Sequence, residues 1–541
     1  MVVGGPTEIE LKLRVSPEDI IALRNDPHFA GALHDPTRET LDSVYFDSDE
    51  RFLRDHGLTL RVRHKGDERI QTVKAVNHGA GYFERSEWEQ AIEGDQPDLS
   101  GVKDTALGPI LIDDMHKTLK PVFETRIERT AYHLNGNDAD IIMAIDEGQI
   151  LATGSSRPVS EIELELKHGD PADLFKIARD IFSIIPAQLD FKSKAERGYE
   201  LIGKAAVAAE TACDPELSAG MSTGHAFTLV GRTCLRHLVA NVPAMLSRDG
   251  NALHQMRVAL RRLRAAISLF SVVVGDDRVG AIKTELRWLA QQCGPARDLD
   301  TLLVEVINPL RKRHANEPGL ASIANMFARK RLKNYRLAQE AVQSARFRTL
   351  VLDTAEWIET GPWSTSEDAL MRARRELPVE IFAAEQLSQR RKRIRRRGAR
   401  MNSLSPQQLH RLRIQVKKAR YATEFFSGLF RGKKSAKRCK EIRLSLMQLQ
   451  NCLGRINDIV THKALFTDII ASPAKGLTGE QSRHRAFAAG LIIGDQQAQV
   501  QRLLDRARRA YSRFDSAKAF WKLSSRSSAA QASAAQESAE E

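Results

Sequence analysis

The sequence predicts a multidomain α+β protein: an antiparallel β-barrel of about eight strands with flanking helices, then an all-α duplicated helical bundle. Three observations predict this. Residues 7–203 alternate between apolar and charged side chains with a period of two, which is typical of strands. From about residue 225 the apolar period becomes helical. The charge divides at the same place: residues 1–205 hold 25 Lys and Arg against 38 Asp and Glu, and the remainder holds 57 against 31.

The first predicted strand, EIELKLRV at residues 8–15, sets the pattern for the acidic half. Its charged residues share one face and its aliphatic residues share the other. The same pattern recurs in LTLRVRHK, YFERSEWEQAI, DADIIMAIDEGQI and SEIELELKH, while short helices are expected near residues 17–25 and 171–184. If the aliphatic faces form the core, the charged faces line a barrel that can hold one small ligand. The alternative is a sheet whose charged face meets water and forms cross-strand ion pairs.

The expected lining mixes two kinds of charge, which restricts the ligand. Clustered carboxylates suit a hard, oxygen-ligated cation such as Mg²⁺ or Mn²⁺. Clustered Arg and Lys side chains suit phosphate oxygens. Both together favour a metal-bound chain of phosphates.

EIELK at residues 8–12 resembles the ExExK signature of the CYTH domain superfamily, the triphosphate tunnel metalloenzymes. LRVR, TVK, RSEWE, ETRIERT, AIDEG, EIELEL and SKAERGYEL follow in the family's order, so the resemblance spans residues 6–204. It implies an antiparallel tunnel barrel that hydrolyses or cyclises triphosphates with a divalent metal, Mg²⁺ or Mn²⁺. Three carboxylates stand in register where the family often has an acidic pair, so which two of Glu161, Glu163 and Glu165 bind metal stays open.

Carried over to this sequence, the resemblance implies a set of metal ligands and a set of phosphate-binding catalytic residues. The implied metal ligands are Glu8, Glu10, Asp146, Glu161, Glu163 and Glu165. The implied phosphate-binding residues are Lys12, Arg61, Arg63, Lys74, Arg85, Arg126, Arg129, Lys194 and Arg197. Arg129 has the opposite strand parity to Arg126, so a β-bulge is needed for both to face inward. Glu87 and Glu89 match a further inward acidic pair.

The basic half contains an internal repeat. HQMRVALRRLRAAISLF begins at His254 and HRLRIQVKKARYATEFF begins at His410, and each places a basic stripe along one helix face. Downstream, LAQQCGPARDLD and LMQLQNCLGRIND align Gly294 with Gly454 and Asp298 with Asp458. Two matches in the same order predict a duplicated helical unit. A basic stripe on a single helix is usually only solvated, and it is the recurrence that favours a shared polyanion site.

The repeated HxxR stripe and the Gly-x-x-x-Asp elements resemble the CHAD domain, over residues 225–520. The family implies two four-helix bundles whose basic stripes line a cavity, and binding of inorganic polyphosphate. The implied polyphosphate-binding residues are His254, Arg257, Arg261, Arg264, His410, Arg413, Lys417 and Arg420. Lys417 stands where the first repeat has Arg261, which keeps the charge but loses the bidentate guanidinium.

The rest of the chain is less specific. We expect a linker at 205–224, the helical domain at 225–521 and a disordered Ser/Ala/Glu tail at 522–541. Five scattered cysteines and the lack of a long apolar run predict a cytoplasmic protein without a membrane partner, and an association with polyphosphate granules is a further hypothesis. The basic run QRRKRIRRRGAR at 389–400 lacks a stacking platform, so no specific nucleic acid is expected.

These expectations combine into one functional hypothesis. The N-terminal domain hydrolyses inorganic triphosphate to pyrophosphate and phosphate, and the helical domain binds polyphosphate. The alternatives are hydrolysis of thiamine triphosphate or a nucleoside triphosphate, cyclisation of ATP, and a non-catalytic polyphosphate-binding scaffold. Because all the implied ligands lie within residues 1–205, we also expect that half to act without the other.

Overall fold

The structure is a computed structural model of the 541-residue chain. The residues that it describes are 7–30, 33, 35–75, 83–111, 118–135, 139–203, 208–471 and 477–522. The expected disordered tail lies outside them, apart from its first residue, and so does part of the expected linker.

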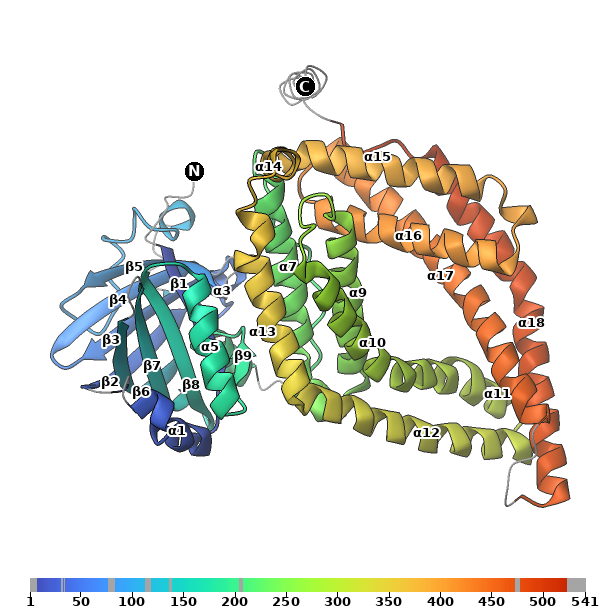
Figure 1. The fold of residues 1–541 in the computed structure, drawn as a ribbon, viewed down its shortest axis with the longest axis horizontal. Coiled ribbons are helices and arrows are strands. Elements are labelled where there is room, and N and C mark those ends of the chain that lie inside the picture. The colour runs from blue at the N-terminus through green and yellow to red at the C-terminus, as the bar shows by residue number, and fades with distance from the viewer. Residues whose placement is uncertain are drawn as a thin grey trace. The chain divides into compact units, whose positions relative to one another are not determined.

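The N-terminal half is built on a nine-stranded antiparallel sheet, with the order β5-β4-β3-β2-β6-β7-β8-β1-β9 (Figure 1). Strand β5 also pairs with β1, so the strand pairing returns to its starting point. The strands are β1 (Thr7–Arg14), β2 (Thr37–Asp47), β3 (Leu58–Lys65), β4 (Glu68–Ala75), β5 (Glu84–Ala91), β6 (Lys120–Asn135), β7 (Asp140–Ala152), β8 (Ser155–His168) and β9 (Gln188–Asp190). The helices are α1 (Pro17–Arg24), α2 (Pro27–Ala30), α3 (Phe52–Asp55), α5 (Ala172–Ile184) and α6 (Lys194–Ile202).

The aliphatic face of the sheet forms core, as the alternation predicts. Leu11 of β1 is opposite Leu164 of β8, and Leu13 is opposite Ile162, and all four are buried. Helix α5 lies near β1 and β8 and buries its own apolar side, including Phe175. Because successive side chains of a strand alternate between faces, this packing fixes the charged residues of β1 and β8 on the opposite face.

The C-terminal half is helical throughout, apart from its connecting segments. Its helices are α7 (Thr223–Ala240), α8 (Val242–Leu246), α9 (Gly250–Leu269), α10 (Arg278–Leu302), α11 (Asn308–Arg313), α12 (Pro318–Gln343), α13 (Ala345–Thr360), α14 (Ala369–Glu376), α15 (Val379–Gly398), α16 (Pro406–Phe426), α17 (Lys433–Ala471) and α18 (Gly479–Ser516). The predicted α+β organisation, an antiparallel sheet with helices followed by an all-helical part, is confirmed.

The chain folds into two compact units whose division differs from the boundary between sheet and helices. The first unit is Met1–Glu216 together with Arg232–Met256 and Ala341–Pro362. The second unit is Leu217–Gly231, Arg257–Glu340 and Trp363–Glu541. Parts of α7 and α9, and α13 as a whole, therefore belong to the same unit as the sheet.

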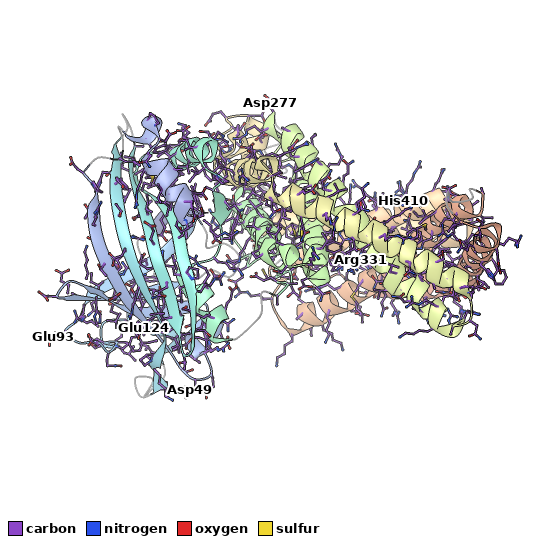
Figure 2. All side chains as sticks on the ribbon, turned by 90° about the horizontal axis from the view of Figure 1, so that it is seen from below. Asp49, Glu93, Glu124, Asp277, Arg331 and His410 are labelled. Carbon is purple, nitrogen blue, oxygen red and sulfur yellow. The ribbon has the colours of Figure 1, made fainter. Side chains whose placement is uncertain are left out.

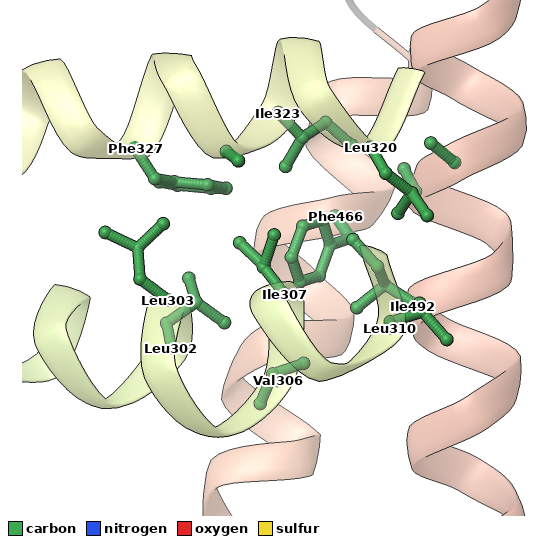
Figure 3. Packing of buried hydrophobic residues seen from close by; sticks show 13 residues of the cluster. Leu302, Leu303, Val306, Ile307, Leu310, Leu320, Ile323, Phe327, Phe466 and Ile492 are labelled. Carbon is green, nitrogen blue, oxygen red and sulfur yellow. The ribbon is translucent and has the colours of Figure 1, made fainter. Parts of the chain in front are cut away.

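The second unit has a hydrophobic core where segments distant in the sequence meet (Figure 3). Leu302 and Ile307 precede α11, and they pack with Phe327 of α12, Phe466 of α17 and Ile492 of α18. The rings of Phe327 and Phe466 contact each other edge to face, with centroids 5.9 Å apart. Near this core, Arg331 projects from α12 (Figure 2), and its Nε pairs with the carboxylate of Asp300.

The two repeats predicted from the sequence lie against each other in the second unit. The phenylalanines that close the two motifs, Phe270 and Phe426, have ring centroids 5.9 Å apart, and both contact Phe382 of α15. Arg262 of α9 also reaches Glu424 of α16, at 3.5 Å. Within the described residues all five cysteines are free, and no helix is both long and apolar enough to cross a membrane.

Candidate active site

The charged face of the sheet surrounds a cavity of about 660 Å³. Strands β1 to β8 contribute to its wall, and α6 supplies the rest. Eleven of the fifteen residues implied for this site line it: Glu8, Glu10, Lys12, Arg61, Arg63, Lys74, Arg129, Asp146, Glu163, Glu165 and Lys194. The charged face therefore lines an internal space and is not an ordinary solvated surface.

A cluster of three carboxylates lies at this cavity: Asp146 and Glu163 line it, and Glu161 is buried beside them. Asp146 of β7 is directly opposite Glu161 of β8, and Glu163 follows on the same face. One oxygen from each of these three side chains lies within 4.8 Å of the others. Three hard oxygen donors at this spacing fit Mg²⁺ or Mn²⁺. The register between β7 and β8 thus brings Glu161 and Glu163 close to Asp146.

Cations compensate this cluster in the structure. The Lys194 ammonium donates to Asp146 at 2.6 Å and to Glu163 at 3.0 Å, and it also pairs with Glu161. Arg129 makes two 2.7 Å bonds to Asp146 and reaches Glu163 at 2.5 Å. Burial raises the pKa of Glu163, but Lys12, Lys194 and Arg129 outweigh burial and hold that pKa well below its usual range.

A second group of carboxylates comes from β1 and the end of β8. Glu10 is directly opposite Glu165, and Glu8 lies one pleat away on the same face. Burial and then the nearby Glu8 and Glu10 raise the pKa of Glu165, although Lys167 opposes the rise. Lys12 contacts both groups, because its ammonium lies 3.0 Å from Glu10 and also pairs with Glu163. Mutual repulsion in this group favours uptake of a cation.

The remaining cations face the carboxylates from β3 and β4. Lys74 pairs with Glu87 at 2.6 Å and with Glu8 at 3.2 Å, and Arg61 pairs with Glu87 at 3.3 Å. Arg63 differs, because no carboxylate of the described residues lies within salt-bridge distance of it, and its Nε reaches only Ser43, at 3.4 Å. Burial and then Arg61 and Arg129 lower the pKa of Arg63 to about 10. A half-buried guanidinium without a carboxylate partner among the described residues attracts an anion.

Three implied residues whose side chains the structure describes, Arg126, Glu161 and Arg197, do not line the cavity. Arg126 is on the outer face: its side chain is 60% exposed and pairs with Glu124, which Figure 2 labels on the sheet. The expected inward direction of Arg126 is wrong, because β6 turns Thr125, Ile127 and Arg129 inward without a bulge between them. Glu161 and Arg197 pair with each other and both are buried, with Glu161 on the same face of β8 as Glu163. The side chain of Arg85 lies outside the described ones.

Tyr45 lines the cavity and was not expected from the sequence. It follows Ser43 on the inward face of β2, opposite Arg61, and its ring stacks on Phe123 with centroids 4.5 Å apart. Burial raises the pKa of the phenol, but the adjacent Arg61, Arg63 and Lys194 outweigh burial and lower it. Alternation in SVYFD places Ser43 and Tyr45 on one face of β2, which could have indicated that both line the cavity. Neither Ser43 nor Tyr45 is charged, so the pattern of charged faces did not include them.

The basic stripes of the two repeats approach each other in the second unit. Burial and then Arg413, Arg261, Arg264 and Lys418 lower the pKa of Lys417 to about 8. These cations come from both α9 and α16, so the two helices contribute to one positive cluster. The cluster can take a polyanion that neutralises several cations at once.

The Gly-x-x-x-Asp elements sit beneath these stripes. The Arg257 guanidinium pairs with Asp298 at 3.0 Å, and a Cβ on Gly294 would lie 2.8 Å from its Nη1. In the second repeat, a Cβ on Gly454 would lie 3.7 Å from Arg413 Nε. In the first repeat, glycine therefore leaves room for Arg257 to lie across α10, whereas a Cβ at Gly454 would make only an ordinary contact with Arg413.

Other expected polyphosphate contacts have protein partners already. His410 Nδ1 lies 2.6 Å from Asn457 Oδ1, and Arg420 pairs with Glu424 at 3.5 Å. The basic run 389–400 lies mostly in α15, where Arg391 contacts the backbone carbonyl of Asp515 and Arg395 contacts its carboxylate. At least two cations of that run therefore hold α15 against the end of α18.

Comparisons with known proteins match the sheet-containing and the helical parts of the chain to two different families. Residues 6–199 match the CYTH domain family model, and residues 230–467 match the CHAD domain model. An inorganic triphosphatase from Haemophilus influenzae is 32% identical over 206 residues, which are 36% of this chain and 55% of that protein. The chain thus spans about half the length of this curated relative.

Two solved structures illustrate the likeness. The CHAD domain from the plant Ricinus communis is 28% identical, with a TM-score of 0.46, covering 56% of this chain and 96% of that one. A putative adenylyl cyclase from Hippeastrum, described as having a dominant triphosphatase activity, is 18% identical, with a TM-score of 0.30, covering 37% of this chain and 97% of that one.

Proposed function

Because this chain joins an N-terminal CYTH domain to a C-terminal CHAD domain, we propose that it hydrolyses inorganic triphosphate and binds inorganic polyphosphate. Hydrolysis is assigned to the cavity of the sheet, with Mg²⁺ or Mn²⁺, and gives pyrophosphate and phosphate. The observation that carries this proposal is the lining of the cavity, where two clusters of carboxylates face the cations Arg61, Arg63, Lys74 and Arg129. The inorganic triphosphatase relative supports the choice of substrate.

The carboxylates and the cations have different tasks in this proposal. Asp146, Glu161 and Glu163 would hold one metal ion, and Glu8, Glu10 and Glu165 offer donors for another. Bound metal neutralises phosphate oxygens and lowers the pKa of a bound water. Arg61, Arg63, Lys74 and Arg129 bind the phosphate chain and stabilise the charge that builds up as the P–O bond breaks.

Lys12 and Lys194 connect the two sets of groups. Each ammonium contacts a proposed metal ligand and lines the cavity, so each can stabilise phosphate charge next to the carboxylates. Loss of either lysine leaves buried carboxylates uncompensated, which raises their pKa, and it removes a cation that can stabilise phosphate charge.

The helical half is assigned to polyphosphate through its two basic stripes. Arg257, Arg261 and Arg264 of α9 and Arg413 and Lys417 of α16 supply cations from both repeats. A long polyanion that contacts many cations releases its own counterions, so its affinity falls steeply as salt rises, as it does for nucleic acids.

One assay tests the proposed reaction. The purified chain is given Mg²⁺ or Mn²⁺ with tripolyphosphate, thiamine triphosphate, ATP or long polyphosphate, and phosphate, pyrophosphate and cyclic AMP are measured. Tripolyphosphate should give the highest kcat/KM. A preference for thiamine triphosphate or ATP, or production of cyclic AMP, would show that the proposed substrate is wrong. Absence of turnover with every substrate, alongside polyphosphate binding, would favour a non-catalytic scaffold.

A further inference from the structure

Helix α6 carries cations to the cavity although it is only nine residues long. Lys194, at its first position, contacts Asp146 and Glu163, and Arg197, one turn later, contacts Glu161. The helix is thus the element that brings positive charge to all three clustered carboxylates. Its placement decides whether these contacts form.

The start of α6 has a local cap. Ser193 and Glu196 form a capping box, in which the Ser193 side chain accepts from the Glu196 N–H and the Glu196 carboxylate accepts from the Ser193 N–H at 2.9 Å. This arrangement satisfies backbone donors at the start of the helix. It does not by itself fix the helix against the sheet.

A residue of the helical half holds α6 at this same place. Arg236 of α7 belongs to the compact unit that contains the sheet. Its Nη2 donates to Glu196 at 2.5 Å, and its Nη1 donates to the Phe191 carbonyl at 3.0 Å. Burial lowers the pKa of Arg236, but Glu196 and then Glu210 outweigh burial and raise it. The guanidinium therefore spans α6 and the segment that precedes it.

Further contacts join α6, the segments on either side of it and the end of α7. Lys192 pairs with Glu200 of α6 at 2.5 Å and also with Glu210. The Glu210 backbone accepts from Asn241 Nδ2 and donates to Asn241 Oδ1, both at 3.0 Å. Arg236 of α7 therefore holds the segment before α6, and Asn241, which follows α7, holds the segment after α6.

We propose that Arg236 is a positioning residue for the cavity: through Glu196 it holds α6 so that Lys194 and Arg197 stay on the carboxylate cluster. The inference rests on the proposed triphosphatase function, and it adds that the helical half supports catalysis as well as polyphosphate binding. The sequence alone predicts that residues 1–205 act independently, because all the implied ligands lie within them, and Arg236 lies outside them. The contact with Glu196 leads us to expect that such a fragment loses turnover.

The test uses the full-length chain with three substitutions. Arg236→Met removes the guanidinium and keeps the aliphatic stem. Glu196→Gln removes the charge but keeps an acceptor for the capping box, since Gln serves in that motif. The third protein carries both changes. Each is assayed with tripolyphosphate at saturating Mg²⁺ or Mn²⁺, and hydrogen–deuterium exchange of residues 194–202 is followed without substrate.

We expect each single variant to lose about tenfold in kcat, the effect typical of residues that orient catalytic ligands. The double variant should lose no more than either single variant, because both changes break the same contact. The amides of α6 should exchange faster in all three proteins. The matched control is Arg179→Met, which breaks contacts of α5 with Asp353 and Glu356 in the same unit and leaves α6 untouched. It should keep wild-type turnover and α6 exchange.

Unchanged kcat in Arg236→Met or Glu196→Gln would overturn the proposal, and so would a lower kcat without faster exchange in α6. Equal losses in Arg179→Met would show a general effect of loosening the unit, which also overturns it. If Arg236→Met does not fold, Glu196→Gln decides alone. If the wild-type chain hydrolyses none of the triphosphates, the proposed function fails, and the exchange measurement still decides whether Arg236 holds α6.

Discussion

The lowered pKa of Lys417 predicts that polyphosphate affinity depends on pH in a defined range. Burial and then Arg413, Arg261, Arg264 and Lys418 lower this pKa from the ordinary 10.5 to about 8. In the free protein Lys417 therefore loses its proton as the pH rises through about 8. A bound polyanion favours the charged form and returns the pKa toward its ordinary value.

The magnitude follows from proton linkage. Between pH 8 and 10.5, binding takes up close to one proton at Lys417, so Kd rises by up to about tenfold per pH unit. Polyphosphate should accordingly bind about tenfold more weakly at pH 9 than at pH 7 at constant salt. The stability change has the opposite sign. The unfolded chain binds more protons than the folded one in this window, so raising the pH from 8 to 10.5 stabilises the fold through this group.

The assay is a titration with long polyphosphate at pH 7, 8 and 9 and fixed ionic strength. Lys417→Arg keeps the charge over the whole range and should remove most of the pH dependence, because arginine stays protonated. Lys418→Arg is the matched control, since the neighbouring Lys418 is exposed, and it should keep the wild-type slope. The reasoning is refuted if Lys417→Arg retains the tenfold change, or if the wild type binds equally at pH 7 and pH 9.

Three further predictions test the two sites. Glu10→Gln should abolish metal-dependent tripolyphosphate hydrolysis in a folded protein, because it removes a charged oxygen donor; near wild-type turnover at saturating metal would exclude Glu10 as a ligand. Arg129→Gln should lower kcat about 100-fold, whereas Arg126→Gln, on the exposed outer face, should leave kcat unchanged; equal effects would contradict the orientation of β6. Gly294→Ala should weaken polyphosphate binding measured by titration, since its Cβ would lie 2.8 Å from a guanidinium nitrogen, and Gly454→Ala should weaken it less, with 3.7 Å available; the reverse order would count against this packing.

Much of the candidate site could be predicted because alternation in a strand is a local property. The sequence of β1 places Glu8, Glu10 and Lys12 on one face whatever the rest of the chain does, and the structure finds all three in the cavity wall. Parity within one strand is equally local, and Arg126 and Arg129 were known to oppose each other. The prediction that both face inward needed a bulge between them, and β6 pairs with β7 without one, so Arg129 lines the cavity and Arg126 does not.

The helical repeats show the same limit. Two matching motifs in the same order are visible in the sequence, and they predict a duplicated unit. That Phe270 meets Phe426, and that Lys417 lies among cations of both repeats, depends on the packing of α9 against α16. Periodicity defines which face of each helix is polar, but it does not define which helix lies opposite.

The sequence by itself determined the charged face of the strands, the helical repeats and the two family resemblances. Each of these depends only on the spacing of residues that are close together in the sequence. Only the tertiary structure decided that Asp146 joins Glu161 and Glu163, since that depends on the register between β7 and β8. It also decided that Arg236 reaches Glu196 across 40 positions of sequence. Contacts of this range depend on how separate elements pack against each other, and no local pattern in the chain records them.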